Sequence, residues 1–132
     1  NMYCAKNAYG VISWSSTNAA TIINSALSVG SKVFITAGTY VITTSLNPQN
    51  RTILEGDGQA TKLQLANNVN TNLISITGNI EMVTIKNLWL DGNKNNNNAG
   101  SGIYTSNTES FEYSAIDPMH KISDCLITNF KE

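Results

Sequence analysis

The chain has 132 residues, which is enough for one domain with a single modest core. Eight Lys and Arg against nine Asp and Glu leave a formal net charge of −1, so nothing favours binding to nucleic acid or to an anionic membrane surface. Asn, Thr and Ser are abundant, with 19, 14 and 13 residues, whereas charged residues make up only 13%. This composition argues against a helical bundle and favours β-sheet.

Residues 1–16 lack the basic and then apolar pattern of a signal peptide, and we interpret them as an N-terminal extension. No apolar run approaches the roughly 20 residues of a membrane span, so membrane insertion is not expected. Residues 17–29 are predicted to form a helix, because their apolar residues recur at i, i+3, i+4 and i+7 and Gly30 closes the pattern. Ser16, Thr17 and Asn18 are each acceptable as its N-cap.

Beyond Gly30 the chain changes to short runs that alternate apolar and polar residues, separated by Gly, Asn and Pro. The spacers lack regular two-residue Asn-Gly or Asp-Gly turns, so antiparallel pairing of neighbouring runs is not indicated. Three runs align by their apolar positions, "TILEGDG", "VTIKNLWLDGN" and "HKISDCLITNF", which brings Leu54, Ile85 and Ile122 into one column. The repetition predicts stacked parallel strands, with Gly56, Asn87 and Asp124 at a shared corner.

These motifs carry a resemblance to a known family. "VFITAGTY", "LEGDG" and "VTIKNLWLDGN" resemble the N-terminal part of the pectin-lyase-like right-handed parallel β-helix proteins, over about Thr17 to Phe130. The resemblance implies an all-β fold, a right-handed parallel β-helix (solenoid) with an N-terminal capping α-helix. Residues 17–132 would then form the capping helix and the first coils, and the solenoid would continue beyond residue 132. The opening "YCAKNAYGVISWSSTNAATII" is also similar to extracellular β-helix proteins of archaea and their viruses.

Trp89 is the most informative candidate for a binding residue. By alternation it points outward from its strand, while Val83, Ile85, Leu88 and Leu90 point inward. The alignment places Leu126 beside Trp89 on the same face, and two exposed apolar side chains call for a partner. A sugar ring is one candidate partner. Burial against another subunit or under the insertion 91–119 is the other, and we favour burial.

The same insertion carries the block "NKNNNN", which includes Asn95 and Asn96, and the aromatic residues Tyr104, Phe111 and Tyr113. Amide groups beside aromatic rings suit glycan recognition, whereas an asparagine block is equally typical of a disordered polar loop. We therefore predict a carbohydrate or subunit contact formed by five residues: Trp89, Leu126, Tyr104, Asn95 and Asn96.

No catalytic constellation is visible. The four aspartates, Asp57, Asp91, Asp117 and Asp124, show no two acids stacked on one face, as acid–base or Ca²⁺-assisted chemistry would require. An outward pair of Glu55 and Lys86 is interpreted as a surface contact.

His120 is interpreted as a hydrogen-bonded surface or strand residue, since no second ligand stands at metal spacing. The one glycosylation sequon, "NRT" from Asn50, is weak evidence for an extracellular site. No cofactor or metal is predicted. Cys4 and Cys125 fit no Cys-x-x-Cys motif and are predicted to be unpaired.

The predicted function is host attachment, by an extracellular or virion-surface tailspike or adhesin segment that recognises a surface polysaccharide. The alternative is the N-terminal part of a polysaccharide lyase or glycoside hydrolase, and a structural surface-layer protein comes third. Because the last run ends as an open strand, we expect more chain after Glu132 and assembly as a homotrimer.

Overall fold

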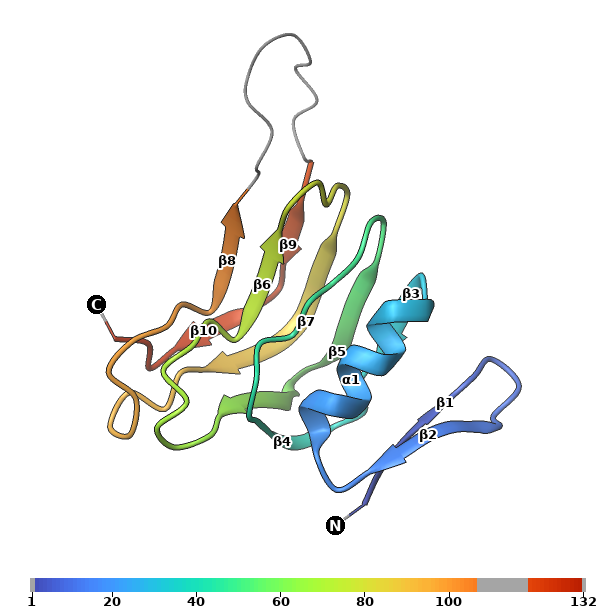
Figure 1. Ribbon diagram of the computed structural model, residues 1–132, viewed down its shortest axis with the longest axis horizontal. Helices are drawn as coiled ribbons and strands as arrows, with labels where there is room; N and C mark the ends of the chain where they lie inside the picture. Colours follow the sequence, from blue (N-terminus) through green and yellow to red (C-terminus); the bar gives the residue numbers. More distant parts are fainter. Residues whose placement is uncertain (1, 107–118, 132) are drawn as a thin grey trace, which may run out of the picture.

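The computed structural model describes residues 2–106 and 119–131. Its helix and strands are, in chain order, β1 (Tyr3–Lys6), β2 (Ile12–Ser16), α1 (Ala19–Val29), β3 (Lys32–Phe34), β4 (Gly38–Ile42), β5 (Ile53–Leu65), β6 (Ile74–Thr77), β7 (Thr84–Asp91), β8 (Ile103–Ser106), β9 (Lys121–Ser123) and β10 (Leu126–Thr128). Figure 1 shows the helix beside a set of roughly aligned strands, with the first two strands standing apart.

The N-terminal extension folds as an antiparallel hairpin of β1 and β2. The Asn7 side chain organises the turn, because its Oδ1 accepts the backbone N–H groups of Tyr9 and Val11, each at 3.0 Å. Gly10 follows with φ +79°, a left-handed conformation that glycine adopts without strain. The hairpin was not predicted, since its turn is longer than the two-residue type that sequence patterns indicate best.

Helix α1 confirms the predicted helix and begins two residues later, at Ala19. Of the three candidate N-caps, Asn18 takes the role, and its Oδ1 accepts the Thr21 N–H at 3.2 Å. The Gly30 N–H donates to the Ala26 carbonyl at 2.8 Å and closes the last turn. The buried face consists of five apolar residues: Ala19, Ala20, Ile22, Ile23 and Leu27.

The strands beyond the helix pair in parallel, as the alignment predicted. The largest sheet has the order β10-β7-β5-β3, with β4 also on β5 and β9 also on β7. Leu54 lies opposite Ile85, and Ile85 lies opposite Ile122, so the predicted column is confirmed. In the second half of β7, Leu90 likewise lies between Leu63 of β5 and Ile127 of β10.

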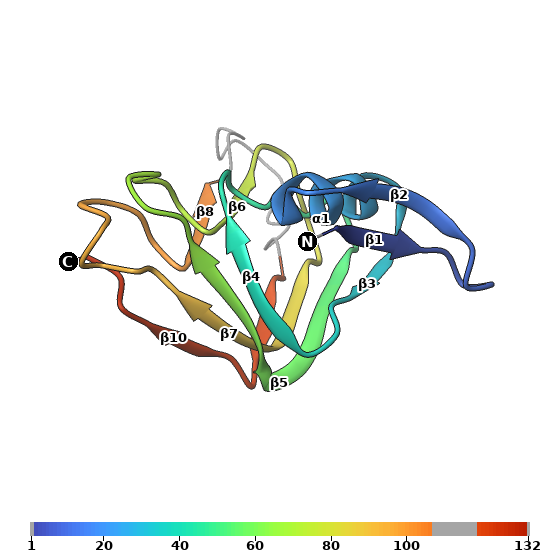
Figure 2. The same ribbon diagram turned by 90° about the horizontal axis from the view of Figure 1, so that it is seen from below.

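The large sheet bends halfway along its strands, and residues with unusual backbone requirements lie at the bend. Figure 2 shows the two arms of the sheet and α1 on the inner side. Asn87 and Asp124 have φ values of +54° and +53°, which confirms their predicted place at corners. At the bend, Leu88 packs so closely against the backbone of Gly56 that a side chain does not fit there, because a Cβ would stand 2.5 Å from Leu88 Cδ2.

The core fills the space between the bent sheet, α1 and the smaller sheet of β6 and β8. Leu54, Ile85, Leu63 and Leu90 are completely buried. Val83, just before β7, and Leu88 are also completely buried, so all four residues predicted to point inward do so. Burial ends at the edge of the sheet, where Ile122 and Ile127 expose 48% and 47% of their surface.

The prediction of an all-β right-handed parallel β-helix is wrong for this chain. The fold is mixed, with a helix, an antiparallel hairpin and strands distributed over three separate sheets, and no solenoid is found in the described residues. Alternating apolar residues specify which strands pair and in what register, but they do not require the paired strands to close into repeated coils. Here β6 and β8 form a sheet of their own.

Cys4 and Cys125 are both free, as predicted. Among residues 2–106 and 119–131, no helix has the length and apolar character that a membrane span requires.

Candidate functional site: a polar pocket near Trp89

Trp89 lies on β7 with Leu126 opposite it on β10, which confirms the predicted pairing. On its other side the indole faces Lys62 of β5, whose Nζ stands 4.3 Å from the ring centroid in a cation–π contact. The indole Nε1–H donates to Thr128 Oγ1 at 2.8 Å. Side chains of the same chain therefore occupy one ring face and the polar edge of Trp89, and leave it half-buried.

Trp89 is thus partly buried by side chains of the two strands next to β7. The sequence had suggested a sugar ring as its partner, or burial against another subunit or under the insertion 91–119. Residues 107–118 of the insertion, including Phe111, Tyr113 and Asp117, lie outside the described residues. The homotrimer stays a prediction, and Ile122 and Ile127 at the sheet edge are among the exposed apolar residues of the described chain.

Asp91 ends β7 and is the centre of a dense polar network. Only 3% of the residue is exposed. Its Oδ2 lies 2.6 Å from Lys62 Nζ and accepts Gln64 Nε2–H at 3.1 Å. Its Oδ1 accepts the Asn93 N–H at 2.9 Å and Asn129 Nδ2–H at 3.2 Å. A buried carboxylate with four donors is satisfied, and Lys62 connects it to Trp89.

The network determines the protonation of Asp91. Burial by itself raises the pKa of this carboxyl, but the hydrogen bonds from Lys62, the Asn93 N–H and Asn129, with the charge of Lys62, more than offset it. The pKa of Asp91 consequently lies below its ordinary value of 3.8. Asp91 is a carboxylate at neutral pH and is not a proton donor.

Beside Asp91 the surface is hollowed into a small pocket of about 210 Å³. We call it the polar pocket, and its lining consists of Gln64, Asp91, Asn93, Lys94, Asn95 and Asn129. The strands β5 and β7 contribute Gln64 and Asp91, and the following loops contribute the other residues. Every lining side chain is an amide, a carboxylate or an ammonium group, so the pocket offers both donors and acceptors to a ligand.

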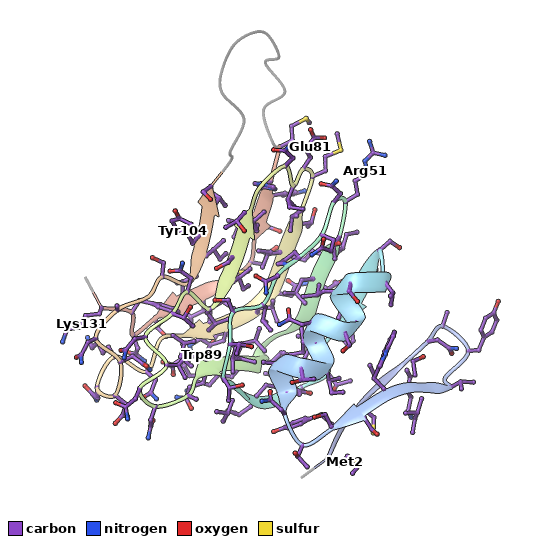
Figure 3. The ribbon with its side chains drawn as sticks, in the orientation of Figure 1. Met2, Arg51, Glu81, Trp89, Tyr104 and Lys131 are labelled. Carbon is purple, nitrogen blue, oxygen red and sulfur yellow. The ribbon has the colours of Figure 1, made fainter. Side chains whose placement is uncertain are left out.

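The five predicted contact residues do not form one cluster. Asn95 lines the polar pocket, and Asn96 lies next to it, where its Nδ2 donates to Asn93 Oδ1 at 2.9 Å. Tyr104, by contrast, is on β8 in the separate two-stranded sheet and is 44% exposed. Figure 3 labels Trp89 and Tyr104 and shows them on different strands.

The asparagine block is ordered and stacks on the preceding loop. Asn97 is buried, and its Oδ1 accepts the N–H groups of Val69 and Asn70 at 2.9 and 3.0 Å. Its Nδ2 donates to the carbonyls of Ala66 and Gly92 at 2.9 and 3.2 Å. In this loop, hydrogen bonds from side-chain amides thus take the place of the backbone hydrogen bonds that join neighbouring strands in a sheet. The alternative of a disordered polar loop is wrong for residues 93–98.

The remaining charged candidates have structural roles. Glu55 forms ion pairs with Lys32 at 3.0 Å and with Lys86 at 3.5 Å, as expected for a surface contact. His120 Nδ1 accepts the Val83 N–H at 3.3 Å, just before β9 begins at Lys121, in agreement with its interpretation as a hydrogen-bonded surface or strand residue. In the described part of the chain, no three His, Cys, Asp or Glu side chains gather into a group that could hold a metal ion.

A larger groove of about 970 Å³ lies between the β1–β2 hairpin, α1 and β3. Its walls are mostly apolar, with Tyr3, Trp14 and Phe34 among them. Among the residues that the structure describes, no carboxylate or imidazole lines it, so its greater size does not make it the better candidate for polar recognition or chemistry.

Most residues of the polar pocket were not predicted from the sequence. Lys62, Gln64 and Asp91 meet because β5 bulges between Glu55 and Lys62, which shifts the pairing so that Gln64 faces Asp91. The available signal was the run "TKLQLA", which continues the alternation of β5 and could have been aligned with "LWLDG". Asn129 could be placed near Asp91 only from the register of β10 on β7, in which the preceding residue, Thr128, lies opposite Asp91.

Acid is expected to destabilise the protein below about pH 4. The lowered pKa of Asp91 means that its stabilising contribution is complete above its unfolded pKa, near 3.8, and is lost as the pH falls through the lower folded value. Glu55 acts in the same direction, because hydrogen bonding to Lys32 lowers its pKa from 4.5. Urea unfolding at pH 7 and pH 3 measures the loss, which Asp91→Asn and Glu55→Gln should each reduce. Equal pH dependence in Asp91→Asn and the parent protein would contradict this assignment.

Comparisons with family models, with curated proteins and with solved structures found no significant match. The resemblance drawn from the motifs consequently stays a prediction, and the functional argument rests on the geometry of the site.

Proposed function

We propose that this chain is a carbohydrate-binding segment of an extracellular or virion-surface protein, of the tailspike or adhesin kind, that attaches to a surface glycan. The observation that carries the proposal is the polar pocket, where amide, carboxylate and ammonium groups converge on a hollow of about 210 Å³. Each sugar hydroxyl both donates and accepts hydrogen bonds, and Asn and Gln side chains offer both kinds of partner. A few convergent polar groups in a concave site are typical of small-ligand recognition.

The surroundings of the pocket support the same proposal. Trp89 lies two residues before Asp91 and therefore on the same side of β7, where it adds apolar surface next to the polar groups. The ordered asparagine layer holds Asn95 at the pocket wall, because Asn93 and Asn97 anchor the loop on either side of it. A pocket that exists before the ligand arrives binds with a smaller entropy cost.

A polysaccharide lyase or hydrolase is the weaker candidate for this part of the chain. Hydrolysis of a glycosidic bond uses a pair of carboxyl groups, one of which must be protonated. Asp91 is the one carboxylate among the lining residues of the polar pocket, and its pKa is lowered. A purely structural surface-layer role predicts no glycan binding at all.

Replacing Asn95 by alanine is expected to weaken glycan binding about fivefold, since one hydrogen bond is worth about 1 kcal/mol. The parent protein is first screened on an array of bacterial, archaeal and plant oligosaccharides, and the affinity for the best ligand is measured by calorimetry. Asn98→Ala is the matched control, because Asn98 is an exposed asparagine of the same loop that does not line the pocket. Absence of binding across the array, or equal losses in the two variants, would overturn the proposal.

A further inference from the structure

Asp91 has no capacity left for a ligand. An ionised carboxylate accepts about four hydrogen bonds, two at each oxygen. Lys62 and Gln64 occupy Oδ2, and the Asn93 N–H and Asn129 occupy Oδ1. The residue at the centre of the polar pocket therefore acts on a ligand only through the groups that it holds in place.

Two of those groups are side-chain amides whose orientation Asp91 imposes. A carboxylate only accepts hydrogen bonds, so Gln64 must turn Nε2 towards it and Asn129 must turn Nδ2 towards it. The oxygen of each planar amide then points away from the carboxylate. Within the described residues, neither Gln64 Oε1 nor Asn129 Oδ1 accepts another hydrogen bond, and both side chains line the pocket.

We infer that the polar pocket recognises a sugar ring through two adjacent free hydroxyl groups, which donate to Gln64 Oε1 and Asn129 Oδ1. This inference rests on the proposed function and names the chemical class of the ligand. Asp91 is a positioning residue that keeps both amide oxygens facing the pocket. A methyl ether at these ligand positions cannot donate, and a sulfate or carboxylate there meets two acceptors and is repelled.

The positive charges near the pocket do not change this preference. Lys62 is paired with Asp91 at 2.6 Å, so its charge is neutralised locally. Lys94 is exposed to solvent, where water and salt screen its ammonium group, so it adds little to the affinity or the specificity of binding. Lys94 can still contact an anionic group elsewhere on a longer glycan, which leaves the requirement for two free hydroxyl groups intact.

The test compares matched ligands on the parent protein and on Asn129→Gly. Glycine adopts the backbone φ of +58° at this position without strain, so the change removes the amide alone. The control is Asn68→Gly, since Asn68 is exposed, has φ +60° and does not line the pocket. The probes are methyl glycosides of glucose, galactose and mannose, each with its adjacent hydroxyl groups free or O-methylated one at a time, titrated by NMR.

For the best free glycoside, Asn129→Gly is expected to raise Kd about five- to tenfold, while Asn68→Gly leaves Kd unchanged. O-methylation of the one hydroxyl that donates to Asn129 should weaken binding to the parent protein by a similar factor, and this loss and the loss in Asn129→Gly should not add, because both changes remove the same hydrogen bond. Asp91→Asn should lower affinity in the same way and shift the NMR signals of the Gln64 and Asn129 side-chain amides. If Asp91→Asn does not fold, Gln64→Met supplies the second amide deletion.

The outcomes separate this inference from the proposed function. Equal affinity for free and O-methylated glycosides, or additive losses in Asn129→Gly, would overturn the recognition of two hydroxyl groups while glycan binding itself stands. Failure of every glycoside and of the whole array to bind would overturn the proposed function, and this inference with it.

Discussion

Leu90→Ala is expected to lower the free energy of unfolding by about 2–5 kcal/mol, the usual cost of removing a completely buried leucine from a core. Leu90 has no exposed surface and lies between Leu63 of β5 and Ile127 of β10. The deletion leaves a cavity between strands that are held by backbone hydrogen bonds on both sides and therefore cannot collapse into it. Urea unfolding followed by circular dichroism measures the change.

Ile127→Ala is the matched control for Leu90→Ala. The two residues are direct partners in the parallel pair β7–β10, but Ile127 exposes 47% of its surface. Its truncation should cost less than about 1.5 kcal/mol, because much of the side chain remains in water in the folded state. A loss as large as that of Leu90→Ala would mean that another chain or segment covers this edge of the sheet in solution.

Asn97→Ala is expected to cost about 2–4 kcal/mol, an unusually large effect for a polar residue in a loop. Asn97 is only 2% exposed, and its side chain satisfies the N–H groups of Val69 and Asn70 together with the carbonyl of Ala66. Alanine leaves these backbone groups without partners in a site from which water is largely excluded. The melting temperature and the unfolding free energy both report the loss.

Asn98→Ala tests whether the effect belongs to position 97 or to the asparagine block as a whole. The Asn98 side chain is exposed and makes no hydrogen bond in the described structure, where only its backbone N–H bonds to Asn70 Oδ1. We expect a change within about 0.5 kcal/mol. Similar losses in both variants would contradict the specific role of Asn97.

Local features of the fold could be predicted from the sequence because they depend on neighbouring residues. The helix at 19–29 follows from its apolar periodicity, and it occurs where expected. The corners at Asn87 and Asp124 follow from the tolerance of these residue types for left-handed angles. The column of Leu54, Ile85 and Ile122 follows from alternation, since a shift of one residue would expose every apolar side chain.

The candidate site was predicted only in part, because its members come from distant segments. Trp89, Leu126 and Asn95 were named from pattern and composition, and the first two do pair. Asp91 stood out from the sequence only as the first residue of the insertion 91–119, yet it is buried and central. Its burial depends on Lys62, which faces Trp89 only because β5 bulges, and a bulge is not visible in an alternating pattern.

The sequence by itself thus determined the helix, the apolar faces of the aligned strands and the shared register of Leu54, Ile85 and Ile122, because each of these depends on local backbone preference and on period. Tertiary structure alone decided that the strands separate into three sheets, that residues 3–16 form a hairpin, and that four donors meet on one carboxylate. These features depend on the balance of burial and hydrogen bonding between segments far apart in the sequence, such as the residues 27 and 38 positions apart that bond to Asp91, and no local pattern records this balance.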